Sequence, residues 1–152
     1  MTTAGFDFSA SGPSFLPRRH APRPLRIIVA DDDRDTVQML GAILQDEGHR
    51  VHGVYTGKAV LPAVRIFCPD VVIVDVNIPG LSGYAVAQAV RHAFIDLRMP
   101  LLIAISGVWT ETPDRLVAEQ MGFEHHLTKP ADPKDVLALL EGFPRRRHPT
   151  QQ

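Results

Sequence analysis

The sequence predicts an α/β fold in which a doubly wound, five-stranded parallel sheet with strand order 2-1-3-4-5 carries five helices. Short apolar runs alternate five times with segments of helical periodicity, which is the pattern of repeated strand–helix units. The run Val71–Val74 is entirely β-branched, as expected for a strand buried on both faces. Four of the five runs end at polar residues, as strands do where a parallel sheet opens into a ligand-binding crevice.

Composition is that of an ordinary globular protein. The chain has 152 residues, 45% of them hydrophobic, which is enough for one domain with its own core. Its first residues lack the basic start and apolar block of a signal peptide, and no apolar run approaches the roughly 18 residues of a membrane span. The single cysteine excludes an intrachain disulfide and fits a reducing compartment. We therefore expect a cytoplasmic protein.

Charge divides the chain into a domain and two tails. Residues 25–143 carry ten Lys or Arg and sixteen Asp or Glu, whereas the tails together carry six arginines and one aspartate. Residues 1–24 are rich in Gly, Ser and Pro, and we expect them to be disordered; their phenylalanines could dock on a partner. Residues 144–152 form a basic tail that is too short for a DNA-binding domain. Such basic tails either keep a protein soluble or bind nucleic acid or an acidic partner.

Caps and breakers delimit the elements in the first half of the domain. Asp33 is a favourable N-cap for the first helix, and Gly48 is a stop signal. Thr56 could cap the second helix, although Pro62 should delay its start or kink it. The expected elements are a strand at Leu25–Ala30, a helix at Arg34–Glu47, a strand at Arg50–Tyr55, a helix ending near Phe67 and the strand that begins at Val71.

Similar signals delimit the second half. Ser82 is a favourable N-cap, and Pro113 occupies the first position of a helix, where proline is favoured. The last strand is short and polar, so we expect it at an edge of the sheet. The expected elements are a helix from Ser82 to about Ala93, a strand at Leu101–Ile105, a helix at Thr112–Met121, a strand at Glu124–Thr128 and a helix from Asp132 to about Gly142.

The polar residues at the strand ends form the candidate site. Asp31 and Asp32 follow the first strand, Asp75 the third, Ser106 the fourth and Lys129 the fifth. In the order 2-1-3-4-5 the first and third strands are neighbours, with the crevice between them. The three aspartates should therefore converge, flanked by the serine and the lysine.

Three converging carboxylates favour a divalent cation. Two unit charges ~4 Å apart repel by about 4 kcal/mol at an effective dielectric near 20. An all-oxygen ligand set favours Mg²⁺, and the main-chain carbonyl of Asn77 could add one more oxygen. Asp75 lies between this metal and Lys129, so it is the best placed to act as a nucleophile and form an aspartyl phosphate. The Ser106 hydroxyl would then bind a phosphoryl oxygen.

This pattern resembles the receiver domains of two-component response regulators. The resemblance covers Leu25–Phe143 and includes the segment DVNIPGLSGY around Asp75. It implies a flavodoxin-like fold and a stand-alone protein whose Asp75 takes a phosphoryl group from a phosphohistidine on a histidine kinase or phosphotransfer protein. Signalling would follow by contact with a downstream protein or by phosphorelay, and the only catalysis would be the protein's own phosphorylation and dephosphorylation. The family residues carried over are Asp31, Asp32, Asp75 and the Asn77 carbonyl for Mg²⁺, with Ser106 and Lys129 for the phosphoryl group.

The chain departs from the family pattern at one position. The residue three before Lys129 is usually Tyr or Phe, but here it is His126. Either a partly exposed histidine packs as a smaller ring, or its pH-sensitive imidazole changes the switch. Two nearby residues also bear on function: Val108 offers no hydrogen bond to an attacking water, and Trp109 should report ligand binding by fluorescence.

Two other functional classes remain open. The segment Asp33–Thr36 superficially resembles the nucleophile motif of haloacid-dehalogenase-type phosphatases, but the sequence shows no obvious cap domain. A receiver-like interaction module that is never phosphorylated is the second alternative, although the pocket has every expected residue. We expect Cys68 to pack at a helix end. We expect no metal site at His49, His52, His92 and His125, whose spacing is unsuitable.

Overall fold

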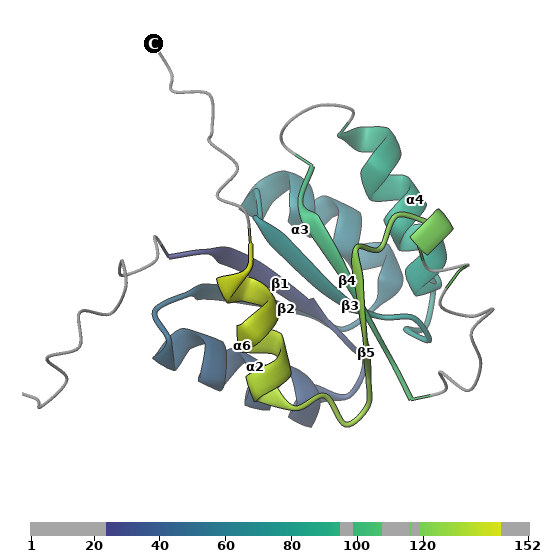
Figure 1. Cartoon of the computed structure of the whole chain (residues 1–152). Helices are drawn as coiled ribbons and strands as arrows, with labels where there is room; N and C mark the ends of the chain where they lie inside the picture. The colour runs from purple at the N-terminus through teal and green to yellow at the C-terminus, as the bar shows by residue number, and fades with distance from the viewer. Residues whose placement is uncertain (1–23, 95–98, 108–115, 117–118, 144–152) are drawn as a thin grey trace, which may run out of the picture.

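The computed structural model describes residues 24–94, 99–107, 116 and 119–143, and it confirms the predicted fold class. Five parallel strands form one sheet in the order β2-β1-β3-β4-β5 (Figure 1). The strands are β1 (Arg26–Ala30), β2 (Arg50–Val54), β3 (Val71–Asp75), β4 (Leu101–Ser106) and β5 (His125–Thr128). The helices in the described part are α2 (Arg34–Asp46), η2 (Gly57–Ala59, a 3₁₀ turn), α3 (Val60–Phe67), α4 (Gly83–Ala93) and α6 (Pro133–Glu141).

Several expectations fall outside this part of the chain. The helix predicted at Thr112–Met121 lies mostly outside the described residues. The same holds for residues 1–23, residues 144–152 and the positions of Val108 and Trp109. Among the described helices, none is long and apolar enough to cross a bilayer.

The predicted helix caps are largely confirmed. The side chain of Asp33 accepts a hydrogen bond from the Asp35 backbone N–H at 3.0 Å, and the Ser82 hydroxyl accepts one from Ala85 N–H at 3.2 Å. Each bond satisfies an N–H that the first helical turn leaves without a partner. The local sequence signals were therefore sufficient to predict where these two helices begin.

The start of α3 differs from the simplest expectation. Thr56 makes no capping hydrogen bond through its side chain, and η2 precedes the α-helix instead. The helix proper begins at Val60, so Pro62 falls in its first turn. A missing N–H costs little there, because the first-turn N–H groups have no intrahelical acceptor. The delayed start predicted from Pro62 is thus confirmed, whereas side-chain capping by Thr56 is wrong.

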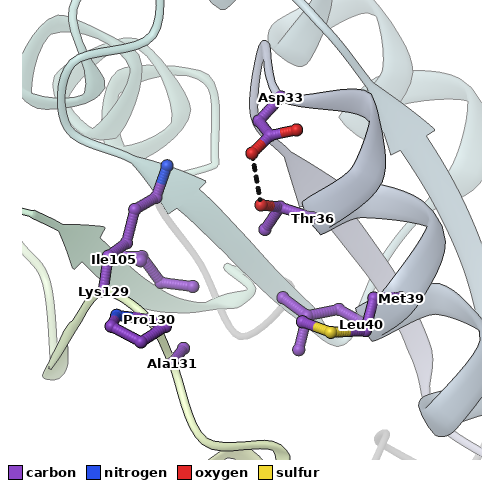
Figure 2. A pocket seen from close by; sticks show the side chains of 8 residues that line it. All are labelled: Asp33, Thr36, Met39, Leu40, Ile105, Lys129, Pro130 and Ala131. Carbon is purple, nitrogen blue, oxygen red and sulfur yellow. Dashed lines mark hydrogen bonds between the residues drawn. The ribbon is translucent and has the colours of Figure 1, made fainter.

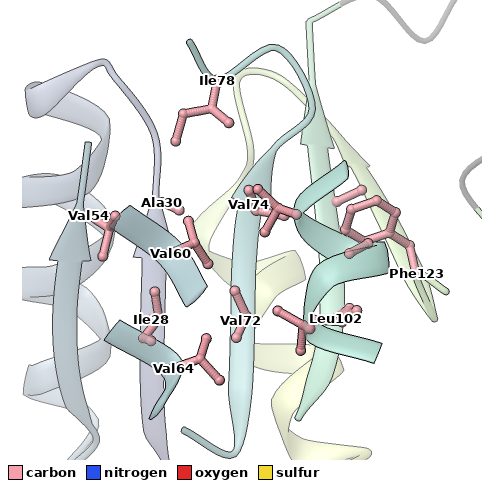
Figure 3. Packing of buried hydrophobic residues seen from close by; sticks show 14 of the residues in the cluster. Ile28, Ala30, Val54, Val60, Val64, Val72, Val74, Ile78, Leu102 and Phe123 are labelled. Atoms are coloured by element: carbon pink, nitrogen blue, oxygen red, sulfur yellow. The ribbon is translucent and has the colours of Figure 1, made fainter. Parts of the chain in front are cut away.

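Two apolar layers cover the sheet. Helices α3 and α4 pack on one face and α2 and α6 on the other (Figure 1). Alternate strand residues serve each layer: Val72 and Leu102 face α3 and α4 (Figure 3), whereas Ile73 and Ile103 face α2 and α6. All five residues of β3 are buried, and full burial of each aliphatic side chain contributes about 1.5–3 kcal/mol. The strand that ends at Asp75 is therefore a firm support for that residue.

Cys68 lies at a helix end, as predicted, but it does not pack there. The residue closes α3 in a left-handed conformation, with φ of 51°. Its thiol is exposed and donates to the Arg65 carbonyl oxygen at 3.6 Å. The expectation of a packed cysteine was wrong, because the sequence does not reveal the left-handed turn that ends the helix.

Acid should weaken the fold through His49. This residue is only 9% exposed, and its Nδ1 accepts a hydrogen bond from the Leu25 N–H at 3.1 Å. Burial lowers the pKa of His49 below 6.5, and the Glu47 charge opposes this only partly. The neutral imidazole is therefore favoured in the folded state. Its contribution should be complete above the unfolded-state pKa near 6.5 and should be lost as pH falls through the folded-state pKa.

Urea unfolding between pH 7 and pH 5 tests this expectation. We expect His49→Asn, whose side-chain oxygen can accept the same bond without titrating, to flatten the fall of the unfolding midpoint with acid. His92→Asn is the matched control, because His92 is exposed in the last turn of α4 and its loss should leave the slope as it is. Equal slopes in all three proteins would contradict the role of His49.

Candidate functional site

The carboxyl ends of β1 and β3 bring three aspartates together, as the strand order predicted. The two strands pair in parallel, with Ala30 opposite Val74, so that Asp31 and Asp75 lie at the same edge of the sheet. One carboxylate oxygen from each of Asp31, Asp32 and Asp75 lies within 4.8 Å of the other two. Asp31 and Asp75 are 2% and 6% exposed, whereas Asp32 is exposed. Two carboxylates are thus held inside the site, and the third stands at its mouth.

Backbone donors orient the two buried carboxylates. Asp75 Oδ1 accepts from the Asn77 N–H at 2.9 Å, and Asp31 Oδ1 accepts from the Asp33 N–H at 3.0 Å. In both cases the donor lies two residues further along the chain, in the turn that follows the strand. Hydrogen bonds of this kind fix the orientation of the carboxylate. The second oxygen of each group is left to face Lys129.

The Lys129 ammonium joins these two carboxylates. Its Nζ lies 2.7 Å from Asp31 Oδ2 and 3.0 Å from Asp75 Oδ2, and the side chain is 27% exposed. Partial burial alone would lower the pKa of Lys129, but its hydrogen bonds to Asp31 and Asp75 outweigh that effect and raise the pKa above 10.5. Lys129 is therefore positively charged at neutral pH. One ammonium among three carboxylates leaves an excess of negative charge that suits a divalent cation.

The last two strands hold Ser106 and Lys129 beside each other. Ser106 ends β4 and is buried, and its backbone carbonyl accepts a hydrogen bond from the Lys129 N–H at 2.9 Å. Ile105, the residue before it, pairs with Asp75 in the sheet register. The structure thus brings all five predicted strand-end residues to one edge of the sheet. The Lys129–Pro130 peptide bond is cis.

Asn77 is held in the turn after β3. Its backbone N–H is engaged by Asp75, and its side chain is exposed. The Ile78 N–H donates to the Asp75 carbonyl at 3.2 Å, which closes the turn. The use of the Asn77 carbonyl as a metal ligand stays a prediction.

Two glycines that the sequence reasoning missed hold the segment after Asp75. A Cβ on Gly57 would lie 1.9 Å from the Leu81 carbonyl oxygen, and one on Gly83 would lie 2.6 Å from the Val76 Cα. The Gly57 N–H also donates to the Pro79 carbonyl at 2.9 Å. The turn after β2 and the turn after β3 are thus packed backbone against backbone. No local motif marks Gly57, because its partner lies more than twenty residues away in the chain.

An apolar cavity adjoins the acidic cluster. It has a volume of about 280 Å³ and lies between α2 and the segment after β5 (Figure 2). Asp33 stands at its rim, where the Thr36 hydroxyl donates to Asp33 Oδ2 at 3.0 Å. That bond is the main reason why the pKa of Asp33 lies below its usual value. The lining residues are Asp33, Thr36, Met39, Leu40, Ile105, Lys129, Pro130 and Ala131.

The histidine at the usual aromatic position is half-buried. His126 lies on β5, opposite Ala104 of β4, and β5 is an edge strand as predicted. This placement agrees with a partly exposed ring that packs as a smaller aromatic. Its effect on switching stays a prediction. Within the described residues, the cluster of possible metal ligands contains aspartates and no histidine.

Most of the chain is similar in sequence to known proteins. The family model described as "Response regulator receiver domain" matches residues 27–141. The DNA-binding response regulator MtrA of Mycobacterium tuberculosis is 31% identical over 121 residues, which cover 80% of this chain and 51% of MtrA. An uncharacterised 14.6 kDa protein of Leptolyngbya boryana is 32% identical over 117 residues, which cover 77% of this chain and 88% of that protein. The chain spans about half the length of MtrA and 88% of the second relative.

Structural comparison agrees with the sequence relatives. The chemotaxis response regulator CheY4 of Vibrio cholerae superimposes with a TM-score of 0.72 at 25% identity, over 79% of this chain and 98% of CheY4. The BeF₃-activated receiver domain of DrrB superimposes with a TM-score of 0.69 at 26% identity, over 80% of this chain and 97% of that domain; DrrB is a protein of Thermotoga maritima.

Proposed function

The chain belongs to the response regulator receiver domain family, and we propose that it takes a phosphoryl group from a phosphohistidine onto the Asp75 carboxylate. Receiver domains are signalling modules that accept phosphoryl groups, and the donor would be a histidine kinase or a histidine phosphotransfer protein. The observation that carries the proposal is the bridge from Lys129 Nζ to Asp31 and Asp75 within the cluster of three carboxylates. The bridge holds the Asp75 carboxylate beside a cation at the end of a buried strand, which supports its proposed role as the acceptor.

The transfer needs little chemistry beyond positioning and charge stabilisation. A carboxylate oxygen of Asp75 attacks phosphorus, an O–P bond forms and the N–P bond to the histidine breaks. The imidazole leaves as a neutral ring when its other nitrogen carries a proton. Lys129 can stabilise a phosphoryl oxygen while it keeps its 2.7 Å contact with Asp31. The Ser106 hydroxyl would bind a second phosphoryl oxygen.

The residues of the cluster fit Mg²⁺. Asp31, Asp32 and Asp75 would hold the ion together with the main-chain carbonyl of Asn77. The donor set is all oxygen, as Mg²⁺ prefers, and the carboxylates outnumber the nearby ammonium by two. When bound, the ion would neutralise charge on the phosphoryl oxygens.

We further propose that the receiver signals through protein contacts. Phosphorylation would change its contacts with a downstream protein, or the phosphoryl group would be passed on in a phosphorelay.

Asp75→Asn should abolish phosphorylation, because the amide is not a nucleophile comparable to a carboxylate. The experiment is to incubate the chain with phosphoramidate and Mg²⁺ and to measure by mass spectrometry the gain of one phosphoryl group on the peptide that contains Asp75. Asp33→Asn is the matched control, since Asp33 caps α2 outside the three-carboxylate cluster, and it should still gain the group. Chelation of Mg²⁺ should slow the gain in both phosphorylatable proteins.

Two outcomes would replace the proposal by an alternative. Turnover of a phosphate monoester that survives Asp75→Asn would favour a phosphatase. Failure of the unsubstituted protein to gain a phosphoryl group from phosphoramidate, and also from a panel of phosphorylated kinases, would favour an interaction module that is never phosphorylated.

A further inference from the structure

The apolar cavity beside Lys129 has the size of a receptor for one or two side chains. Its volume of about 280 Å³ lies below the ~300–1,000 Å³ usual for drug-sized ligands. Leu40 and Ile105 are buried in its wall, whereas Met39 is 47% exposed at its edge. Figure 2 shows these side chains between α2 and the segment that starts at Lys129. No other described residue lines this opening, so an occupant would have to come from elsewhere.

Exposed carboxylates lie at the cavity and near it. Asp33 lines it, Asp132 follows the lining residue Ala131, and the others lie at the starts of α2 and α6, whose N-caps are Asp33 and Asp132. Only Arg34 and Lys134 offset them at these two helix starts. An occupant should therefore combine an apolar anchor with neighbouring positive charge. The exposed acids are Asp32, Asp33, Asp35, Asp132 and Asp135.

The chain carries such a segment before the described domain. Phe15 and Leu16 are followed, after one proline, by Arg18 and Arg19. The other candidates in the tails are less suitable. The Phe6–Phe8 segment contains an aspartate and no cation. The C-terminal run Arg145–Arg147 follows Phe143 and Pro144, but Phe143 already packs against the apolar layer that α2 and α6 cover.

The same segment is long enough to reach the cavity in its own molecule. The described chain starts at Pro24, next to the beginning of β1, and the five residues of β1 cover about 17 Å on the way to the site. The nine residues from Phe15 to Pro24 span at most about 30 Å when extended. A tether of this length gives an effective concentration in the millimolar range, so weak contacts are enough for occupancy.

We propose that the segment Phe15–Arg19 docks into this cavity, with its apolar pair inside and its arginines on the acidic rim, and thereby shields Lys129 and Asp75 from the phosphoryl donor. The docking itself follows from the geometry and charge of the cavity, whereas its effect on phosphorylation rests on the proposed function. The segment would act as an internal competitor that a partner must displace before phosphotransfer.

The test compares the full chain with Phe15→Ser/Leu16→Ser and with the matched control Phe6→Ser/Phe8→Ser. The Met39 methyl resonance, assigned with Met39→Leu, reports occupancy of the cavity, and the rate of phosphorylation by phosphoramidate reports shielding. We expect the first variant alone to shift the Met39 signal and to raise the rate about threefold to tenfold, since the competent open state is then fully populated. Moderate salt should produce the same shift in the unsubstituted chain, because it screens the arginine contacts.

Each other outcome has a definite meaning. A Met39 signal that is identical in all three proteins overturns the docking of Phe15–Arg19. The occupant of the cavity would then be a partner protein. A signal that changes with protein concentration but not with Phe15 and Leu16 assigns the cavity to a second copy and also overturns it. A shifted signal with an unchanged rate overturns the shielding. A shifted signal in a protein that never gains a phosphoryl group upholds the docking and refutes the proposed function.

Discussion

Lys129→Met should destabilise the protein by about 2 kcal/mol at neutral pH, because it leaves two buried carboxylates without their common cation. Breaking a fully buried ion pair typically costs ~3–5 kcal/mol; the smaller figure allows for solvent screening at a lysine side chain that is 27% exposed. Methionine keeps most of the apolar stem, so the change isolates the charge. Urea unfolding at pH 7 without divalent ions measures the effect.

Mg²⁺ should restore part of this loss, and it should therefore raise the melting temperature of Lys129→Met more than that of the unsubstituted protein. A ligand that binds only the folded state stabilises it by mass action, by about 2.7 kcal/mol at one hundred times its dissociation constant. The matched control is Lys134→Met, because Lys134 is an exposed residue of α6 outside the cluster. Equal stability of the two lysine variants, with or without Mg²⁺, would show that Lys129 does not balance the carboxylates.

Gly57→Ala should destabilise the fold by about 3 kcal/mol, at the upper end of what overpacking usually costs. The added methyl carbon would lie 1.9 Å from the Leu81 carbonyl oxygen and 2.7 Å from the carbonyl carbon. Neither atom can turn aside as a flexible side chain would, so the two turns must separate. Their separation would also weaken the hydrogen bond from the Gly57 N–H to the Pro79 carbonyl. Phosphorylation at Asp75 should slow in parallel, because Pro79 and Leu81 belong to the segment that follows it.

Gly41→Ala is the matched control for this prediction. Gly41 is buried within α2, but a Cβ there would meet only Val51 Cγ1 at 3.7 Å, an ordinary contact. The glycine-to-alanine change in a helix interior should stabilise the protein by roughly 0.5–1 kcal/mol. Thermal unfolding should thus shift in opposite directions for the two variants. A loss at Gly57 no larger than about 0.5 kcal/mol would mean that the turns yield without strain.

Local patterns predicted most of the fold. The β-branched run before Asp75 indicated a strand buried on both faces, and all five residues of β3 are buried. Asp33 and Ser82 marked helix starts whose capping bonds are present. The five strand-end residues of the site could also be predicted, since parallel strands place their carboxyl ends at one edge of the sheet. These features depend on neighbours within a few residues or on the order of the strands.

Other features were decided by the tertiary structure. The sequence placed Lys129 near the aspartates, but its hydrogen bonds to both Asp31 and Asp75 depend on how β5 lies against β4. It gave no sign that Gly57 must lack a side chain or that His49 is buried, and it wrongly suggested that Cys68 is packed. Each of these depends on contacts between segments far apart in the chain, or on one left-handed residue. The sequence thus determined which chemical groups meet at the sheet edge, and packing decided how each is held there, because hydrogen-bond geometry and close backbone contacts are set by distant residues.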